Sequence, residues 1–431
     1  MLAENADTPM ADGAAAFAPA RASRRRLVVF MLSPRVIDFD TYLPTALALK
    51  EARPDWQIRF VTFSAKNFDF IRRNSTLMRG LERCGTLHCL DAKTAPNTLV
   101  RWWRRISGFG RICVWVLRWK RPILFAGRQF SSGPYPVWFL LARLRRGRGI
   151  ILAGGRGVDA GIHPHVQPRL MVSDLGPSMV RRLFGRDADA LIHYHDRQTL
   201  YLNALNRWGT VQPLPNLCMG LPNQLEAWRR LVIAEAAAER ERLRATGHPI
   251  GEIYCFFAPK TASSANLRTP DSAERTFRQI LMALRQLRRK STILVRPHPL
   301  AENAAYLSDT LGWLHDPHIV VSLAHPEVLI ALSRRAIVNA PTNVAFTSPE
   351  GRFIDCADYR EEHYDRQGET SLGQGYGTIF VNPAAPDFER RLESALSDAP
   401  WEGGSLFVER ERLLAAHPPR LDKLMSLLGA E

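Results

Sequence analysis

The sequence predicts an α/β protein of two Rossmann-like domains, each a doubly wound parallel sheet, that face one another across a cleft. Short apolar runs typical of buried strands alternate with helical segments along most of the chain, a pattern that favours parallel sheets covered by helices. The 431 residues exceed what a single core organises. A break at Thr246-Gly-His-Pro-Ile-Gly251 divides the alternation into two runs. We therefore expect two domains.

The first run contains six apolar segments short enough to be buried strands. A helix is expected over Asp40–Ala52, because this segment opens on an acidic residue and ends before Pro54. A second, charged helix is expected over Glu226–Ala245. The expected strands are Leu27–Leu32, Ile58–Phe63, Thr86–Leu90, Pro122–Ala126, Ile150–Ala153 and Ala190–Tyr194.

The second run repeats the alternation, with helices expected over Ser272–Leu287 and Pro326–Ser333 and a final helix over about Leu406–Leu428. We expect a disordered leader (1–23), an N-terminal domain (24–228), a helix and linker (229–251), a C-terminal domain (252–400) and the final helix (401–431). The expected strands are Ile253–Phe257, Thr292–Val295, Ile319–Ser322, Ala336–Asn339, Phe353–Cys356 and Thr378–Val381.

Composition argues against several classes of protein. With 46% apolar and 23% charged residues, the chain is globular rather than disordered. Its six cysteines include no Cys-x-x-Cys pair, which favours reduced, buried thiols in a cytoplasmic protein. No stretch approaches about 18 uninterrupted apolar residues, so we expect no membrane span. Gly154-Gly-Arg-Gly157 lacks the spacing of a dinucleotide fingerprint, which argues against an oxidoreductase.

Positive charge is concentrated in the first half of the chain. Residues 1–230 hold 35 Lys and Arg against 16 Asp and Glu, and no acidic residue lies between Asp91 and Asp159. Within that interval, Arg101-Trp-Trp-Arg-Arg and Cys113-Val-Trp-Val-Leu-Arg-Trp-Lys-Arg interleave indole rings with cations. Interfacial helices present this combination to an anionic bilayer. We therefore expect the basic, Trp-rich stretch 101–148 to contact an anionic membrane, at the inner face of the cytoplasmic membrane.

Two other interpretations of this stretch are open. One is a buried helix–strand pair with a solvated Arg face. The other is nucleic-acid binding, to which the same charge would contribute. No recognised nucleic-acid module accompanies the charge, so nucleic acid is not an expected partner.

A strand-end turn in the second run carries groups suited to a phosphorylated ligand. Arg296-Pro-His-Pro299 follows an expected strand, and in open α/β sheets ligands bind beyond the carboxyl ends of strands. Arg296 supplies a bidentate fork for phosphate oxygens, and His298 donates a hydrogen bond or shuttles a proton. A hydrogen-bonded surface histidine at an ordinary turn is the alternative.

A second strand-end loop begins at Asn339 and ends at Gly351. Its hydroxyls, amides and backbone donors suit phosphate oxygens, and Glu350 would take the two hydroxyls of a ribose. Thr342 or Ser348 as an ordinary helix cap is the alternative. Taken together, the turn and the loop predict a nucleotide-diphosphate site made of Arg296, His298, Asn339, Thr342, Asn343, Ser348 and Glu350.

The Arg296–Pro299 turn, the Asn339–Gly351 loop and the segment Tyr359-Arg-Glu-Glu-His-Tyr resemble the C-terminal half of certain GT-B transferases. These are the CDP-glycerol glycerophosphotransferase and capsule-polysaccharide relatives. The resemblance covers roughly residues 250–395. It implies a donor in the C-terminal domain, an acceptor facing the N-terminal domain, and a final helix that packs back on the first domain.

By position, the resemblance assigns the donor phosphates to His298, Thr342 and Asn343. Pro-Thr-Asn stands where the family has an Asp-Tyr-Ser-Ser-type loop, so the identity of the donor stays open.

Candidates for a general base lie in the N-terminal domain. His163 and His165 follow an expected strand and would deprotonate an acceptor hydroxyl; a structural histidine pair is the alternative. Arg35 follows the first strand and would bind an anionic acceptor, and Asp38 is a third candidate base. A capped helix start, with Arg35 paired to Asp38 or Asp40, is the other interpretation.

The sequence thus predicts a transferase that moves a glycosyl or polyol-phosphate group from a nucleotide-activated donor to a lipid-linked or membrane-associated glycan, in surface polysaccharide biosynthesis. Asp358 to His363 would line the donor pocket, and Gly373-Gln-Gly-Tyr-Gly377 would form a mobile lid. No cofactor or metal is expected, because basic side chains can substitute for a divalent ion. One alternative is a nucleotide-sugar 2-epimerase, which needs carboxylates in the cleft and no membrane surface. The other is a non-catalytic, membrane-bound scaffold with a degenerate transferase fold.

Overall fold

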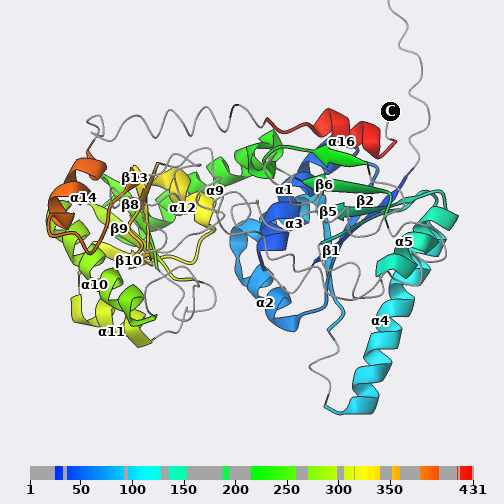
Figure 1. The fold of residues 1–431 in the computed structure, drawn as a ribbon, viewed down its shortest axis with the longest axis horizontal. Coiled ribbons are helices and arrows are strands. Elements are labelled where there is room, and N and C mark those ends of the chain that lie inside the picture. The colour runs from blue at the N-terminus through cyan, green and yellow to red at the C-terminus, as the bar shows by residue number, and fades with distance from the viewer. Residues whose placement is uncertain are drawn as a thin grey trace, which may run out of the picture.

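Two parallel sheets lie side by side in the computed structural model (Figure 1). Every strand pairing is parallel, and helices pack on both faces of each sheet, so the predicted fold class is confirmed. The structure describes residues 25–32, 36–91, 96–127, 135–152, 188–193, 215–258, 270–298, 305–314, 316–339, 352–359, 379–397, 415 and 418–429.

The first sheet has seven strands in the order β3-β2-β1-β4-β5-β6-β7. Its strands are β1 (Leu27–Leu32), β2 (Gln57–Thr62), β3 (Gly85–Cys89), β4 (Ile123–Ala126), β5 (Arg148–Leu152), β6 (Ala190–His193) and β7 (Asn216–Cys218). The helices of this domain are α1 (Val36–Ala52), α2 (Ala65–Arg73), α3 (Ser75–Cys84), α4 (Thr98–Arg118) and α5 (Tyr135–Leu144).

The second sheet has six strands in the order β10-β9-β8-β11-β12-β13. Its strands are β8 (Ile253–Phe257), β9 (Thr292–Arg296), β10 (Ile319–Val321), β11 (Arg335–Val338), β12 (Phe353–Asp355) and β13 (Ile379–Phe380). Its helices are α10 (Pro270–Leu287), α11 (Ala305–Leu314), α12 (Pro326–Leu332) and α14 (Phe388–Leu396).

Alternate residues of each strand enter different cores, as period-two geometry requires. Val28 and Phe30 of β1 pack on the side of α1 and α3, whereas Val29 and Met31 pack on the side of α4 and α5. The first of these cores continues through α9 (Glu226–Ala245) and α12 to one face of the second sheet. The two domains therefore share one apolar core.

The C-terminal segment of the described chain packs against the first domain. Helix α16 (Leu421–Leu427) lies beside that domain in Figure 1, and Arg26 donates hydrogen bonds to the carbonyls of Leu428 (2.7 Å) and Gly429 (2.6 Å). The single helix expected over Leu406–Leu428 is wrong at residues 418–420, which are not helical. Pro418 and Pro419 lack the N–H groups that a helix interior needs.

Three of the six cysteines depart from the expectation of buried thiols. All six are free, but Cys89, Cys113 and Cys218 are only half-buried, while Cys84, Cys255 and Cys356 are buried. Burial raises the pKa of the Cys84 thiol to about 12. Among the described residues, no helix is both long and apolar enough to cross a bilayer.

Candidate functional site

The strand orders locate where a ligand is expected in each domain. In the first sheet the order reverses between β1 and β4, and in the second between β8 and β11. Crossovers leave in opposite directions on either side of such a reversal, which opens a crevice beyond the carboxyl ends of the strands. The loop that begins at Asn339 follows β11, and helix α1 follows β1, so both predicted regions lie at reversal points.

Asp38 marks the reversal point of the first sheet. It lies in the first turn of α1, where its side chain is buried. A Cβ added to Gly127, which follows β4, would lie 3.5 Å from Asp38 Oδ2 and 3.1 Å from the Tyr42 hydroxyl. Burial, assisted by the charge of Asp38, raises the pKa of Tyr135 to about 12. A carboxylate beside two phenols, with a glycine that leaves room, suits the binding of a hydroxyl group.

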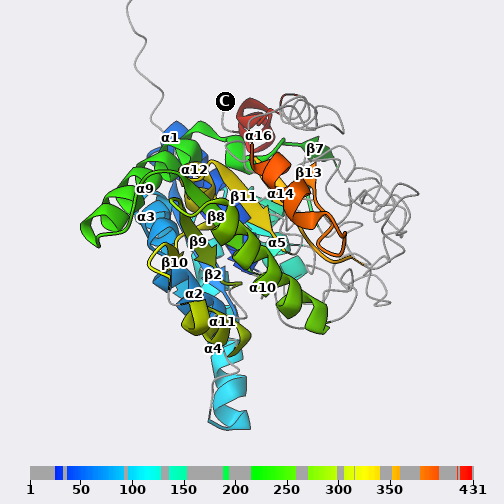
Figure 2. The ribbon, with the colours of Figure 1, turned by 90° about the vertical axis from the view of Figure 1, so that its left-hand side faces the viewer.

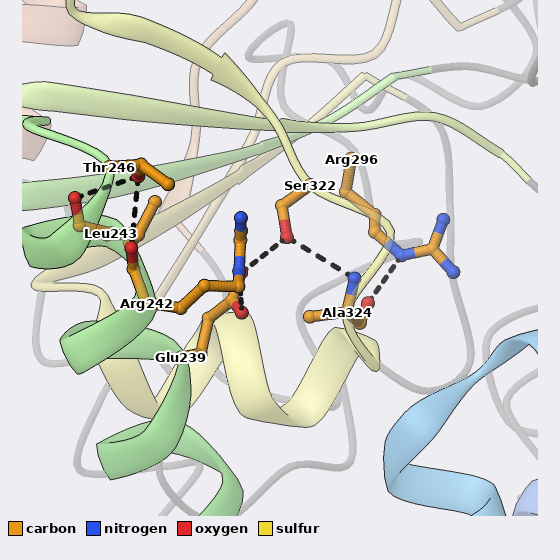
Figure 3. Close-up of polar contacts among 7 residues, drawn as sticks. All are labelled: Glu239, Arg242, Leu243, Thr246, Arg296, Ser322 and Ala324. Atoms are coloured by element: carbon orange, nitrogen blue, oxygen red, sulfur yellow. Dashed lines mark hydrogen bonds and ion pairs between the residues drawn. The ribbon is translucent and has the colours of Figure 1, made fainter.

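Arg296 ends β9 in the second domain and is 3% exposed. Its Nε donates to the carbonyl of Ala324 at 2.8 Å and its Nη1 to that of Pro297 at 2.6 Å. The guanidinium extends past Ala324 in Figure 3. His298, two residues on, is half-buried. Arg296 thus ties the beginning of its turn to the segment that precedes α12.

Asn339 lies directly after β11 and is fully buried, and its Oδ1 accepts a hydrogen bond from the Thr276 hydroxyl of α10 at 3.0 Å. This bond ties the beginning of the predicted phosphate loop to the helix beside it.

A polar network on α9 supports the turn that Arg296 contacts (Figure 3). Arg242 binds Glu239 through two hydrogen bonds of 2.7 and 2.6 Å, and Ser322 donates to Glu239 at 3.0 Å. The hydrogen bond from Arg242 is the largest of the effects that lower the pKa of Glu239. Ser322 Oγ in turn accepts from the backbone N–H of Ala324 at 3.3 Å. The position of Ala324 is therefore set from α9 and from β9 together.

His325 joins the two domains at this place. Its Nδ1 caps α12 by accepting from the backbone N–H of Glu327 at 3.3 Å, and its Nε2 lies 3.5 Å from Oδ1 of Asp40 in α1. Trp228 of α9 contacts His325 edge-on and donates from Nε1 to Glu327 Oε2 at 2.6 Å. His325 follows Ala324, and Asp40 lies two residues after Asp38. The junction therefore brings the carboxyl ends of the two sheets together.

The sequence analysis did not identify His325, Glu327 or Trp228. A local signal was present for one of them, since His325 precedes a proline at the start of a helix, between a strand end and that helix. Its partner Asp40 is distant in the sequence and gave no such signal.

A buried carboxylate ends β12. Asp355 accepts from the Tyr359 hydroxyl at 2.7 Å and from the backbone N–H of Ala357 at 3.1 Å. Burial raises the pKa of Asp355 to about 7, and these two hydrogen bonds only partly oppose that rise. Asp358, where the expected donor-pocket segment begins, is buried beside Tyr359.

Seven of the predicted site residues lie outside the described ranges, and their roles stay predictions. They are Arg35, His163, His165, Thr342, Asn343, Ser348 and Glu350. The proposed lid at Gly373–Gly377 also lies outside them. Within the described ranges, no three His, Cys, Asp or Glu side chains gather closely enough to hold a metal ion.

Helix α4 carries an exposed apolar surface, apart from the strand-end residues described above. It projects from the first domain in both views (Figures 1 and 2). Gly108, Ile112 and Val116 are buried on one side, and a row of large apolar side chains is exposed on the other. At about 100° per residue the exposed set forms a broad band opposite the buried residues, with Phe109 and Trp102 at the edge nearer to Val116. The exposed row consists of Leu99, Trp102, Trp103, Ile106, Phe109, Val114 and Leu117.

Comparisons with known proteins detect the fold only. No protein-family model matches the chain, and no characterised protein matches it significantly in sequence. Solved structures do match. UDP-GlcNAc 2-epimerase from Methanocaldococcus jannaschii superposes with a TM-score of 0.50 at 10% identity, over 91% of this chain and 99% of that one. UGT71G1 from Medicago truncatula, complexed with UDP-glucose, gives 0.51 at 10% identity, over 93% and 98%. The likeness extends over both domains.

Proposed function

We propose that the protein is a transferase that moves a glycosyl or polyol-phosphate group from a nucleotide-activated donor to a membrane-associated glycan in surface polysaccharide biosynthesis. The junction of His325 with Asp40 carries the proposal, because it holds the turn of Arg296 against the helix that bears Asp38. A cationic turn at the end of one sheet and a buried carboxylate at the end of the other suit a transfer between an anionic donor and a hydroxyl acceptor. The similarity in fold to a protein complexed with UDP-glucose supports a nucleotide-sugar donor.

In the proposed reaction an acceptor oxygen forms a bond to the transferred group, while the bond to the nucleotide's phosphate breaks and the nucleotide leaves with the electron pair. Arg296 and His298 neutralise the charge that develops on the leaving phosphate. Arg296 already donates to two carbonyls, so it contributes chiefly a fixed positive charge. Further donor contacts are assigned to Asn339, Thr342, Asn343, Ser348 and Glu350.

The acceptor's proton passes to a base in the first domain, and Asp38, His163 and His165 are the candidates. Arg35 binds an anionic group of the acceptor. The buried position of Asp38 between Tyr42, Tyr135 and Gly127 supports its candidacy, because water is excluded from the site where the proton would move. No metal or other cofactor takes part in the proposed reaction.

The membrane-associated acceptor is inferred from α4. Trp102 and Trp103 are 60% and 65% exposed, and a continuous apolar row of this kind marks an interaction surface. Flanking arginines and exposed indoles suit the interface of an anionic bilayer. The proposed location is therefore the cytoplasmic side of the membrane, with the first domain nearest the lipid.

A nucleotide-sugar 2-epimerase is the second candidate. One observation favours it, since an epimerase needs carboxylates in the cleft, and Asp38, Asp40, Asp355 and Asp358 are buried at the carboxyl ends of the strands. The fold is also that of a UDP-GlcNAc 2-epimerase. The exposed apolar row of α4 favours the transferase, because an epimerase has no use for a membrane surface. A non-catalytic membrane scaffold is the third candidate, and it requires that nucleotides do not bind.

The deciding experiment is thermal stabilisation of the purified protein by UDP, CDP, CMP, GDP and ADP, with His298→Ala and His248→Ala as matched variants. His248 is half-buried in the segment between the domains, before the amino end of β8 and away from the carboxyl ends of the strands. We expect one nucleotide to raise the Tm of the wild type and of His248→Ala but not that of His298→Ala. No shift with any nucleotide would favour the scaffold, and an equal shift in all three proteins would remove His298 from the site.

Incubation with the matching nucleotide-sugar then separates the two enzymes. A transferase releases nucleotide only when acceptor-bearing membranes are added. An epimerase converts the sugar without them.

A further inference from the structure

Helix α4 carries a row of arginines beside its exposed apolar row. Arg104, Arg111 and Arg118 are exposed and lie seven residues apart, so they line up along one flank of the helix. If α4 lies flat on a bilayer, as the proposed membrane association requires, this flank lies at the depth of the lipid head groups. The row ends at Arg118, at the carboxyl end of the helix.

Arg118 lines two adjoining pockets at the amino end of the first sheet. They measure about 690 and 720 Å³ and share Arg25, Arg118 and Trp119. In the first of them Arg59 of β2 stacks on Trp115, with its guanidinium carbon 4.4 Å from the ring centroid. Stacking fixes the plane of the Arg59 guanidinium; its Nη2 donates to Gln57 Oε1 at 3.2 Å, and its remaining N–H groups can contact an oxyanion. We call the two the amino-end pockets.

Most of the cations that line the amino-end pockets contact no carboxylate among the described residues. Burial, and to a smaller extent the nearby charge of Arg118, lowers the pKa of Arg59. Asp55 is the one carboxylate among the residues that line the two pockets. Seven lining side chains contact no carboxylate in the part of the chain that the structure describes: Arg25, Arg59, Arg118, Lys120, Arg121, Arg145 and Arg146.

The backbone at the second pocket is held in an unfavourable conformation. Arg121 has φ 54° and Arg146 has φ 57°, and among the described residues they are the only non-glycine residues with positive φ. Glycine or asparagine is usual in this region, because a Cβ costs about 1 kcal/mol there. Such strain collects at functional sites. Arg146 follows α5 in the left-handed conformation that is common at helix ends, and the side chains of both arginines line the second pocket.

We propose that the amino-end pockets bind the phosphate of an anionic phospholipid in the bilayer on which α4 lies. This inference rests on the membrane association proposed above and adds a defined head-group site to it. Arg59 and Arg118 form the contacts to the phosphate oxygens, and Val114 and Trp119 face the beginning of the acyl region. The continuous run of cations from α4 into the pockets favours a lipid over a soluble anion. The site is separate from the proposed donor site, which lies in the second domain beyond the carboxyl ends of β9 and β11.

The test compares two charge-matched double variants in co-sedimentation with vesicles. One is Arg59→Gln with Arg118→Gln, in the pockets. The other is Arg101→Gln with Arg105→Gln, exposed on the same helix but on the face away from the apolar row. Vesicles of phosphatidylcholine alone and mixed with phosphatidylglycerol are the probes. The double variant Trp102→Ser with Trp103→Ser tests the contribution of the apolar row. The single variant Arg118→Gln, at an exposed position, keeps the test valid if substitution of Arg59 prevents folding.

We expect the pocket variant to lose at least about tenfold in affinity for phosphatidylglycerol vesicles, because each basic residue at an anionic surface contributes roughly fivefold. The control variant should lose less than about threefold. Inorganic pyrophosphate should compete weakly, whereas vesicles should bind the wild type tightly, which identifies the lipid as the source of the phosphate.

Equal losses in the two double variants would overturn the pocket and leave only general charge attraction. Tighter binding of a single-stranded oligonucleotide than of vesicles, lost in the pocket variant, would overturn the lipid assignment in favour of nucleic acid. Binding of pyrophosphate as tight as that of vesicles would assign the pockets to a soluble ligand. Failure of the wild type to bind any vesicle would overturn the pocket and the membrane association together. The nucleotide shift with His298→Ala is measured without lipid, so it tests the donor site independently of these outcomes.

Discussion

The two ends of the first sheet carry charges of opposite sign, and the charged side chains differ in whether the protein supplies a partner for them. At the carboxyl end Asp38 and Asp40 are buried, and the second domain supplies His325 beside Asp40. At the amino end Arg59, Arg118 and their neighbours have no carboxylate partner among the described residues. Buried charges are tolerated when the protein itself partners them. The second domain contributes to the carboxyl end of the first sheet. At the amino end, the proposed partner of the cations is the phosphate of a lipid.

The sharpest way to separate the two ends is to make the same substitution at each. Asp38→Asn should lower kcat about 10²–10⁴-fold if Asp38 is the base, whereas Asp55→Asn at the amino end should leave kcat unchanged. Turnover is measured with the donor that the nucleotide panel identifies. Full activity in Asp38→Asn would transfer the role of base to His163 or His165, which the corresponding His→Asn variants would then test.

The carboxylate at the end of β12 makes stability depend on pH. The folded pKa of Asp355 is raised to about 7, above the unfolded value of about 3.9. The folded state therefore binds its proton more tightly, and the stabilisation present below about pH 4 is lost as the pH rises through about 7. The loss is on the order of 4 kcal/mol. We expect Asp355→Asn to become more stable relative to the wild type between about pH 5 and pH 8, as measured by urea unfolding. Parallel stability curves for the two proteins would contradict this.

Glycines at the two ends should differ in their tolerance of a methyl group. A Cβ on Gly147, before β5, would lie 2.0 Å from the Pro122 carbonyl oxygen, which is backbone. At Gly127, at the carboxyl end, the nearest atom is the Tyr42 hydroxyl at 3.1 Å. We expect Gly147→Ala to lose about 3 kcal/mol of unfolding free energy and Gly127→Ala less than about 1 kcal/mol. Gly110→Ala, with open space around it, is the control, and thermal unfolding measures all three.

The stability of the junction between the domains should depend on the hydrogen bond that the Trp228 indole N–H donates to Glu327. Trp228→Phe removes the donor to Glu327 and leaves that buried carboxylate oxygen without it, which costs about 2 kcal/mol. Trp56→Phe, in which the lost indole is buried away from the junction, controls for loss of ring volume. The unfolding free energies are measured by urea unfolding. An equal loss in the two variants would show that ring packing, rather than the hydrogen bond, stabilises the junction.

The smallest expected effect lies in the strained backbone of the amino end. Arg146→Gly should raise the unfolding free energy by about 0.5 kcal/mol, because glycine accepts φ 57° without penalty, and it should also weaken vesicle binding. Unchanged vesicle binding in this variant would show that the strained conformation has no link to the pockets.

Sequence patterns located most strands within a residue or two, because strands buried on both faces of a parallel sheet are continuous apolar runs. Helix Glu226–Ala245 and strand Ile253–Phe257 were predicted with the bounds that the structure has. Strand β7 was missed, because Asn216-Leu-Cys218 is short and opens on a polar residue. Helix α1 begins at Val36 rather than Asp40.

The candidate site was predictable in its location but not in its contacts. That Arg296 ends a strand follows from the apolar run before it, so its place at the carboxyl end of a sheet was accessible. Its bond to Ala324 depends on how β10 and α12 are joined, and the contact of His325 with Asp40 depends on how two domains meet. Neither relation is encoded in local spacing.

The hydrogen bonds from Arg26 to the carbonyls of Leu428 and Gly429 have a consequence for folding during translation. Arg26 directly precedes the first strand, whereas the two carbonyls that it binds are translated 402 and 403 residues later. The first domain is therefore completed by a segment that is translated after the second domain. Until then, the amino end of its sheet lacks that cover, and a nascent chain halted after the second domain would still be incomplete in the first.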